Sequence, residues 1–298
     1  MVAIIALFLL AGAPGPAAAP RTVDAHGLRF DSPGVLDLAS RTKRPAVPVA
    51  VATKEMSAGD VAQILAAPAI SEDPPLLRFA DEIYGCAKPS PACSRQHESV
   101  LVSASGGAVR REGKHLVVVP MRGMAATFAD WIEPATRGAD GDEEAHWYLG
   151  QLPGSGYERV EVQFGHDAPG SFLINPQNGK VAFVHNGADL VAPSPDGRLL
   201  LTWNSLNPPL SLRVAALDET GPRLVVSCAA LERGVRLTPV FKGWHSAAAF
   251  DFVVAIGESA TSLAAELTRA GSQWVLRASD TARLKRIGFA CTADGTTD

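Results

Sequence analysis

Three Asn-Gly or Asp-Gly dipeptides lie within Gly170–Asn204, and they constrain the fold of this chain more than any other feature. They are Asn178-Gly179, Asn186-Gly187 and Asp196-Gly197, and short apolar runs separate them. Asn, Asp and Gly tolerate the positive φ that tight hairpin turns require. This stretch therefore predicts consecutive antiparallel strands.

Similar runs follow one another at intervals of about 8–12 residues, which is typical of sandwiches, barrels and propellers. The fold class that we predict is mainly β with a few short helices (α+β), arranged as an antiparallel β-sandwich or as partial propeller-like sheets. The predicted strands cover residues 115–119, 157–164, 172–174, 181–184, 199–203, 210–216, 224–228, 235–241, 250–255 and 274–278.

The strand predicted over 157–164 has the clearest period of two. One face would carry Val160, Val162 and Phe164, and the other would carry Arg159, Glu161 and Gln163. Such alternation is typical of a half-buried strand, with its apolar face on a core and its polar face in water.

Helical patterns are few. Ser57 and Asp60 resemble a capping box, with Asp in place of Glu, and predict a helix over 58–66. Pro74-Pro75 begins an amphipathic pattern that predicts a second helix as far as Tyr84, and 261–269 is a third helical candidate. From Ser99 onward the period changes toward two, so Val100–Ser103 is predicted to be a strand.

We expect three regions along the chain: a signal peptide over 1–19, an N-terminal lead-in with two short helices over 20–98, and an antiparallel β domain over 99–298. The apolar run Val2–Ala11 is shorter than the roughly 20 residues that cross a bilayer, and small residues follow it. It lacks a preceding Lys or Arg, so a buried N-terminal strand is the alternative. The signal-peptide interpretation predicts a periplasmic or extracellular protein with no membrane span in the mature chain.

Charge and cysteine content fit that expectation. The formal net charge of −4 provides no broad basic surface, so we expect no nucleic-acid partner. Four cysteines suit an oxidising compartment. We favour disulfides between Cys86 and Cys93 and between Cys228 and Cys291, although four cysteines allow three connectivities and four buried thiols are the alternative.

The segment Leu173–Lys180, which reads LINPQNGK, is followed by SPDGR at Ser194–Arg198 and by Leu199–Leu201. These motifs resemble one repeat of the periplasmic TolB-type β-propellers, in which an NGK hairpin and an SPDG turn lie at strand junctions of a blade. The resemblance covers about one blade, residues 171–218, and implies propeller-like sheets. A full propeller needs four or more blades, and the signature does not recur, so a sandwich or curved sheet with blade-like hairpins is favoured.

Histidine and aspartate residues at predicted strand ends are the first group of candidate functional residues. Imidazole and carboxylate groups that meet at one rim can form a metal site or a general-base pair. The alternative is that they are turn and cap residues that bond local amides. The group consists of His166, Asp167, His185, Asp189 and His245.

Tryptophans in predicted loops are the second group. Trp203 and Asn204 lie in one loop, and Trp244 and His245 lie in another. Loops that carry Trp at the rim of a rigid β scaffold suit contact with a protein or a glycan. The alternative is that both indole rings fold back onto the core.

No Gly-x-Ser-x-Gly elbow occurs, which argues against a serine hydrolase of the α/β type. The sequence therefore predicts a non-catalytic binding protein without a cofactor. Its partner would be a protein or a cell-envelope polymer, engaged through rim loops 164–170, 203–209 and 241–246. The alternative is a metal-dependent hydrolase that uses His166, Asp167, His185 and His245.

Overall fold

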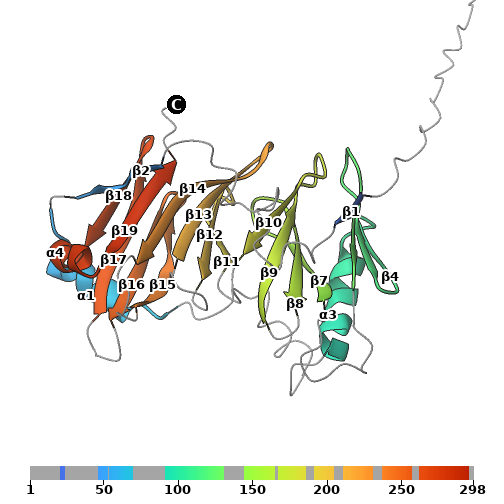
Figure 1. The fold of residues 1–298 in the computed structure, drawn as a ribbon, viewed down its shortest axis with the longest axis horizontal. Helices are drawn as coiled ribbons and strands as arrows, with labels where there is room; N and C mark the ends of the chain where they lie inside the picture. Colours follow the sequence, from blue (N-terminus) through green and yellow to red (C-terminus); the bar gives the residue numbers. More distant parts are fainter. Residues whose placement is uncertain are drawn as a thin grey trace, which may run out of the picture.

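The computed structural model describes residues 21–23, 46–52, 54–69, 91–130, 144–164, 167–185, 191–204, 211–230, 237–256 and 262–294. Within these ranges the chain is mainly β with three helices, so the predicted fold class is confirmed. The strands form four separate sheets, which we name A to D, and none of the four closes on itself in the described part of the chain (Figure 1).

Sheets A and B are both four-stranded. In spatial order, sheet A contains β1 (Arg21–Val23), β6 (Ala126–Ala129), β5 (His115–Val118) and β4 (Val109–Glu112). Strand β1 runs parallel to β6, and the other pairs are antiparallel. Sheet B is an antiparallel meander of β10 (Val181–His185), β9 (Asp167–Ile174), β8 (Glu158–Phe164) and β7 (Glu144–Gln151).

Sheets C and D are larger because each gains strands from distant parts of the chain. Sheet C contains β11 (Val191–Pro193), β12 (Leu199–Asn204), β13 (Ser211–Asp218), β14 (Gly221–Ala230), β19 (Phe289–Asp294) and β2 (Ala46–Pro48). Sheet D contains β15 (Leu237–Ser246), β16 (Ala249–Ile256), β17 (Ser262–Ala270), β18 (Gln273–Ala278) and β3 (Ala50–Val51). The expected lead-in thus supplies an edge strand to sheets C and D, as it does to sheet A through β1.

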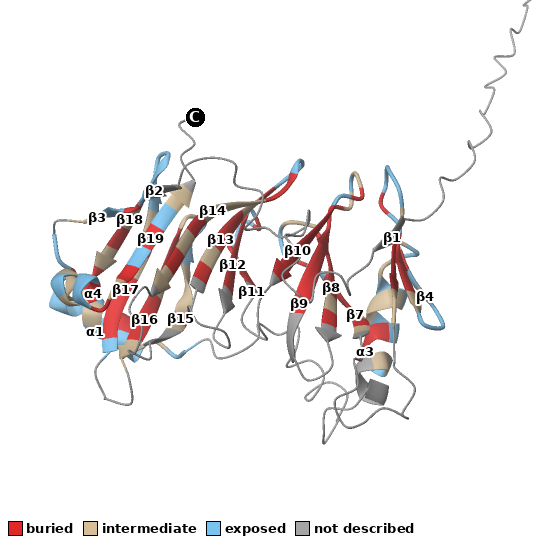
Figure 2. Cartoon of the chain, in the orientation of Figure 1, coloured by how far each residue is buried: buried red, intermediate tan, exposed pale blue. Residues whose placement is uncertain are grey.

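The four sheets stack face to face in the order A, B, C, D (Figure 1). Phe172 and Ile174 of β9 pack toward sheet A, whereas Leu173 between them packs toward sheet C. In the same way, Leu199 and Leu201 of β12 pack toward sheet D and Leu200 packs toward sheet B. Strands that are buried on both faces need apolar residues at successive positions, and buried residues follow one another along these strands in Figure 2.

Glycine turns lock neighbouring sheets together at one end of the strands, which we call the turn end. A Cβ on Gly197, in the turn before β12, would lie 2.1 Å from the carbonyl carbon of Gly154, in the loop between β7 and β8. A Cβ on Gly179, in the β9–β10 turn, would lie 2.7 Å from the carbonyl oxygen of Met124, which precedes β6. Gly179 and Gly197 both have a φ of +70°. Glycine is therefore required in both turns, for its backbone conformation and for the close contact between sheets.

The turn end also fixes the relative direction of sheets B and C. The loop that touches the turn before β12 leads into β8, whose first residue Glu158 pairs with Ile174 at the C-terminal end of β9. Asn178 of sheet B additionally donates its side-chain amide to the carbonyl oxygen of Glu219, in the β13–β14 turn, at 2.8 Å. The beginning of β9 and the ends of β10 and β12 therefore lie together at the opposite end, which we call the far end.

Helix α1 (Ala58–Ala66) forms where the sequence predicts it. Ser57 Oγ accepts a hydrogen bond from the Asp60 amide, and the Asp60 carboxylate accepts one from the Ser57 amide, so the predicted capping box is present. The helix packs Ile64 against Val253 and Ala264 on the outer face of sheet D. Helix α4 (Thr281–Arg286), which the sequence analysis does not predict, has Asp280 as its N-cap.

Two secondary-structure predictions are wrong. Val100–Ser103 is not a strand, because it belongs to helix α3 (Pro91–Ala104). The helical period is hidden there because the inward positions include the polar residues His97 and Glu98, with Leu101 and Val102 one turn later. The predicted helix 261–269 is instead strand β17, whose apolar run is continuous because α1 covers one of its faces and sheet C covers the other.

Other predictions concern covalent and membrane features. The disulfide between Cys228 and Cys291 is present and joins neighbouring positions of β14 and β19. Cys86, the Cys93 side chain, the signal peptide over 1–19 and the predicted helix 74–84 lie outside the described residues. Among the helices of the described ranges, none has the length and apolar character needed to cross a membrane.

Candidate functional site

Four of the predicted binding residues share the far end of sheets B and C. Asp167 is the first residue of β9, and His185 is the last residue of β10, where it pairs with Gly170. Trp203 and Asn204 end β12 in the adjacent sheet. His166 lies just before Asp167, outside the described residues, as do the side chains of the other four. The fold thus brings together positions that are far apart in the sequence.

A buried ion pair lies between sheets B and C. The Arg159 side chain is almost fully buried, with its Nη2 3.8 Å from Glu161 Oε2 and its Nε donating to Ser171 Oγ at 3.2 Å. Val160 and Val162 face sheet A, so Arg159 and Glu161, which alternate with them, face sheet C. The expectation that this polar face of the strand meets water is therefore wrong.

The surroundings of this pair change along the strands. Near the turn end the space between the sheets is apolar, with Leu173, Leu200 and Leu217 among its residues. Farther along β9 and β12, the buried residues Ser171 and Thr202 are polar. Burial raises the pKa of Glu161, although the nearby Arg159 guanidinium lowers it. The pair lies in the middle of the strands, where Arg159 is opposite Leu173 and Glu161 is opposite Ser171. A buried charged pair with a shifted pKa is a feature that often accompanies function.

Trp244 belongs to the core. Its ring packs against Phe250 with ring centroids 5.0 Å apart, and its Nε1 donates to the carbonyl oxygen of Ala192 in sheet C at 3.1 Å. These contacts join sheets C and D and correspond to the alternative in which this indole ring folds back onto the core.

His245 lies on the outer face of sheet D, in a polar row that crosses four strands. The β15–β16 register shifts between Trp244 and Ser246, so His245 is the extra residue of a bulge, a feature that re-aims side chains. Its Nδ1 lies 3.3 Å from Asp251 Oδ2. Asp251 is paired with Glu266, which is paired in turn with Arg277 at an Nη1–Oε2 distance of 2.9 Å. We call these four residues the outer row.

Three carboxylates, those of Asp251, Glu266 and the neighbouring Asp60, lie around the single guanidinium group of Arg277 in the outer row. Burial raises the pKa of Asp251 above 3.8, and the carboxylates of Glu266 and Asp60 raise it further, although His245 opposes the shift. Asp60, on α1, lies 3.6 Å from Arg277 Nη2. Asp251 and Glu266 stand opposite each other on neighbouring strands, where like charges are destabilising.

Three of the four residues proposed for a metal-dependent hydrolase lie in the described part of the chain, and the structure does not gather these three. Asp167 and His185 lie in sheet B and His245 lies in sheet D, with sheet C between them (Figure 1). Sheets that pack face to face lie about 10 Å apart, so sheets B and D are separated by about 20 Å. In the part of the chain that the structure describes, no three His, Cys, Asp or Glu side chains are arranged to hold a metal ion.

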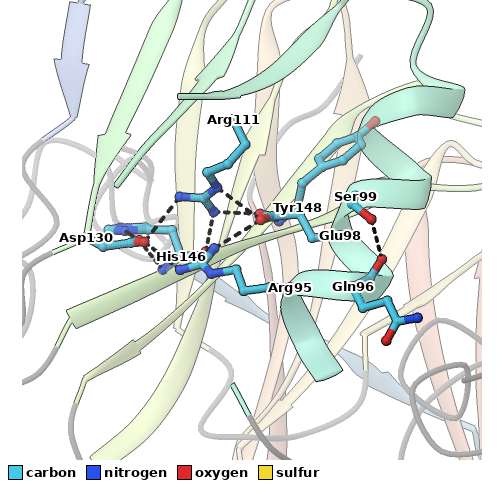
Figure 3. A network of polar contacts seen from close by, with 8 residues as sticks. All are labelled: Arg95, Gln96, Glu98, Ser99, Arg111, Asp130, His146 and Tyr148. Atoms are coloured by element: carbon cyan, nitrogen blue, oxygen red, sulfur yellow. Dashed lines mark hydrogen bonds and ion pairs between the residues drawn. The ribbon is translucent and has the colours of Figure 1, made fainter. Parts of the chain in front are cut away.

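A second charged network lies beneath helix α3 (Figure 3). Arg111 binds both carboxylate oxygens of Glu98, at 2.6 and 3.0 Å, and its Nη1 lies 3.2 Å from Asp130 Oδ2. Arg95 donates to Glu98 Oε2 at 3.0 Å and to Asp130 Oδ2 at 2.5 Å. Two guanidinium groups thus face two carboxylates, so the network is balanced in charge.

This network satisfies the free edge of β7. The amides of His146 and Tyr148 donate to Asp130 and Glu98, each at 2.9 Å, and the His146 carbonyl oxygen accepts from Arg95 and Arg111, each at 2.7 Å (Figure 3). Burial lowers the pKa of His146, although its contact with Asp130 opposes the shift. The side chains of the network thus form the hydrogen bonds to the β7 backbone that a further strand would otherwise form at this sheet edge. We interpret the network as a structural cap of sheet B.

Sequence reasoning missed the Arg159–Glu161 pair and the network beneath α3. For Arg159 and Glu161 a signal was present: the apolar run Phe172–Ile174 in the next strand indicates a sheet that is buried on both faces. For Glu98 and Asp130 the local sequence shows only the i,i+3 pair of Arg95 and Glu98, because the other partners lie on separate elements. Comparisons with protein-family models, with curated proteins and with solved structures found no match to this chain.

Proposed function

We propose that this is a secreted or periplasmic, non-catalytic binding protein, and that it engages a protein or cell-envelope polymer through the far end of sheets B and C. The observation that carries this proposal is the shared position of Asp167, His185, Trp203 and Asn204 at neighbouring strand ends. Residues at the ends of rigid strands have well-defined positions, and exposed loops next to them carry many binding sites.

Export is supported by two features. The apolar N-terminal run Val2–Ala11 has the length of a signal-peptide core. The disulfide between Cys228 and Cys291 suits an oxidising compartment, where such bonds persist. The partner is therefore sought among proteins and polymers of the cell envelope.

The buried pair of Arg159 and Glu161, in the middle of β8, makes the sheet that carries this end rigid in our proposal. Its ion pair and the bond to Ser171 connect β8 to β9 between two packed sheets. A binding surface that is already ordered loses less conformational entropy when a partner binds. We assign this pair a positioning role and not direct contact with the partner.

The test is affinity capture from an envelope extract with a matched pair of Trp→Ala variants. Trp203→Ala should reduce capture of the partner at least about fivefold, with little change in the midpoint of thermal unfolding, because Trp is a frequent hot spot at binding surfaces. Trp244→Ala should instead lower the midpoint by several degrees, because it removes core packing and a hydrogen bond.

Two results would contradict the proposal. The first is that Trp203→Ala captures the same partner as fully as the unchanged protein does. The second is stoichiometric zinc or manganese in the purified protein that is lost in His185→Ala, because this would favour the metal-dependent hydrolase.

A further inference from the structure

The loop between β5 and β6 exposes two methionines that lie three positions apart in the chain. Met121 is 78% exposed and Met124 is 46% exposed. Met56, which precedes α1, is by contrast only 8% exposed. Within the described ranges, this loop therefore presents to solvent the two most accessible thioether groups.

Backbone contacts with sheet B hold this loop in place. The Met121 amide donates to the carbonyl oxygen of Pro176 at 2.7 Å. A Cβ on Gly179 would lie 2.7 Å from the carbonyl oxygen of Met124, so the loop and the β9–β10 turn touch through main-chain atoms. The exposed methionine side chains contribute little to this packing. A chemical change at either sulfur should therefore leave the fold intact.

Met56 has the opposite surroundings. It belongs to the apolar contact between α1 and the outer face of sheet D, together with Ile64, Val253 and Ala264. An oxygen atom added to its sulfur would place a polar group among these apolar side chains, which destabilises a core. The same chemical change is thus tolerated in the loop and damaging beside α1.

Methionine sulfur reacts with peroxides, which are two-electron oxidants, and its susceptibility follows its exposure. Cys228 and Cys291 are already joined as a disulfide and offer no competing thiol. In the reaction a sulfur lone pair attacks one peroxide oxygen, so that an S–O bond forms and the O–O bond breaks. The sulfur loses two electrons and becomes a sulfoxide. The second oxygen takes up the proton of the transferred oxygen and leaves as water.

We propose that the β5–β6 loop is an oxidant-consuming modification site, in which Met121 and Met124 react with peroxide ahead of Met56. Each protein molecule consumes two equivalents of peroxide at this loop while the fold is unchanged. This inference goes beyond the proposed function and does not rest on it, because the loop lies at the turn end and the proposed binding surface lies at the far end.

Peptide mapping by mass spectrometry tests the inference on the full chain treated with hydrogen peroxide. Met121 should be oxidised at least about tenfold faster than Met56, as the ratio of their exposed fractions indicates, and Met124 should react at an intermediate rate. Oxidation of the loop should shift the midpoint of thermal unfolding by less than about 2 °C, as a surface change does. In urea the three rates should become equal, because unfolding exposes Met56.

The double variant Met121→Leu and Met124→Leu is the matched control, because leucine keeps an apolar side chain of similar size without the sulfur. Its loop peptide should gain no oxygen, and Met56 should react at the same slow rate as in the unchanged protein. The inference is overturned if Met56 in the folded protein is oxidised as fast as Met121. It is also overturned if oxidation confined to the loop lowers the thermal midpoint by several degrees, because the two side chains would then contribute to packing.

Discussion

At the residue scale, His245 illustrates how a single bulge changes the role of a side chain. The extra residue in β15 places the imidazole beside Asp251 on the outer face of sheet D. The neighbouring Trp244 packs onto Phe250 in the core. Two adjacent residues that the sequence places in one candidate loop therefore belong to opposite faces of a strand.

Asp251 gives a stability prediction with a defined sign. Burial and two nearby carboxylates raise its pKa above 3.8, so the folded state favours the protonated form. The resulting contribution to the free energy of unfolding is fully present below pH 3.8 and is lost as the pH rises through the raised pKa. Asp251→Asn should therefore raise the thermal midpoint by about 1–2 °C at neutral pH.

Thermal unfolding over a pH series checks this prediction. The gain of the Asn variant should shrink as the pH falls toward 3.8, where the unchanged side chain also becomes neutral. A midpoint that falls at neutral pH in the variant would show that the His245 contact outweighs the repulsion from Glu266 and Asp60.

At the scale of elements, helix α3 depends on polar contacts more than on an apolar stripe. Its inward side carries Arg95 and Glu98 together with Leu101 and Val102. The carboxylate of Glu98 reaches two elements, because it accepts from Arg111 of β4 and from the amide of Tyr148 in β7. The helix therefore connects sheet A to the edge of sheet B.

Glu98→Gln should destabilise the fold strongly. The amide keeps the shape of the side chain but removes the charge that compensates two partly buried guanidinium groups. Loss of one partner from a buried ion pair costs about 3 kcal/mol. Urea unfolding measures this cost, and hydrogen exchange at the Tyr148 amide should accelerate in parallel because the β7 edge loses its cap.

Glu112→Gln provides the control for this prediction. Glu112 also pairs with an arginine, Arg110, but both side chains are at least half exposed. Glu112→Gln should lower the free energy of unfolding by less than about 0.5 kcal/mol. Equal effects of the two substitutions would mean that the network beneath α3 does not stabilise the protein.

At the scale of the whole molecule, stability depends on how the sheets attach to one another. Sheets B and C pack through an apolar layer near the turn end and through the Arg159–Glu161 pair farther along. The turns at Gly154 and Gly197 close this interface by direct backbone contact. A side chain at that contact would push the two sheets apart.

Gly197→Ala should lower the free energy of unfolding by about 2–4 kcal/mol. This loss is the sum of the strain of a left-handed alanine and the cost of overpacking. Gly271→Ala is the control, because Gly271 also has a positive φ, +61°, but a Cβ there meets nothing within 4 Å. It should cost only about 1 kcal/mol. Chemical unfolding of the two variants gives the comparison, and equal costs would show that the sheets are not held at this contact.

Local sequence determined the features that depend on neighbouring residues. The turns at Asn178-Gly179 and Asp196-Gly197, the capping box of α1 and most strands of sheets B to D follow from backbone preferences within a few residues. The pairing of Cys228 with Cys291 was one of three alternatives, and the alignment of β14 with β19 decided it.

The tertiary structure alone decided which faces are covered. The period of two along β8 is the same whether its polar face meets water or sheet C, so the burial of Arg159 follows only from stacking. The continuous apolar run of β17 is compatible with helix or strand until sheet C and α1 cover its two faces. The clustering of Asp167, His185, Trp203 and Asn204 likewise required the sheets to be aligned, because contacts between distant segments leave no trace in local sequence.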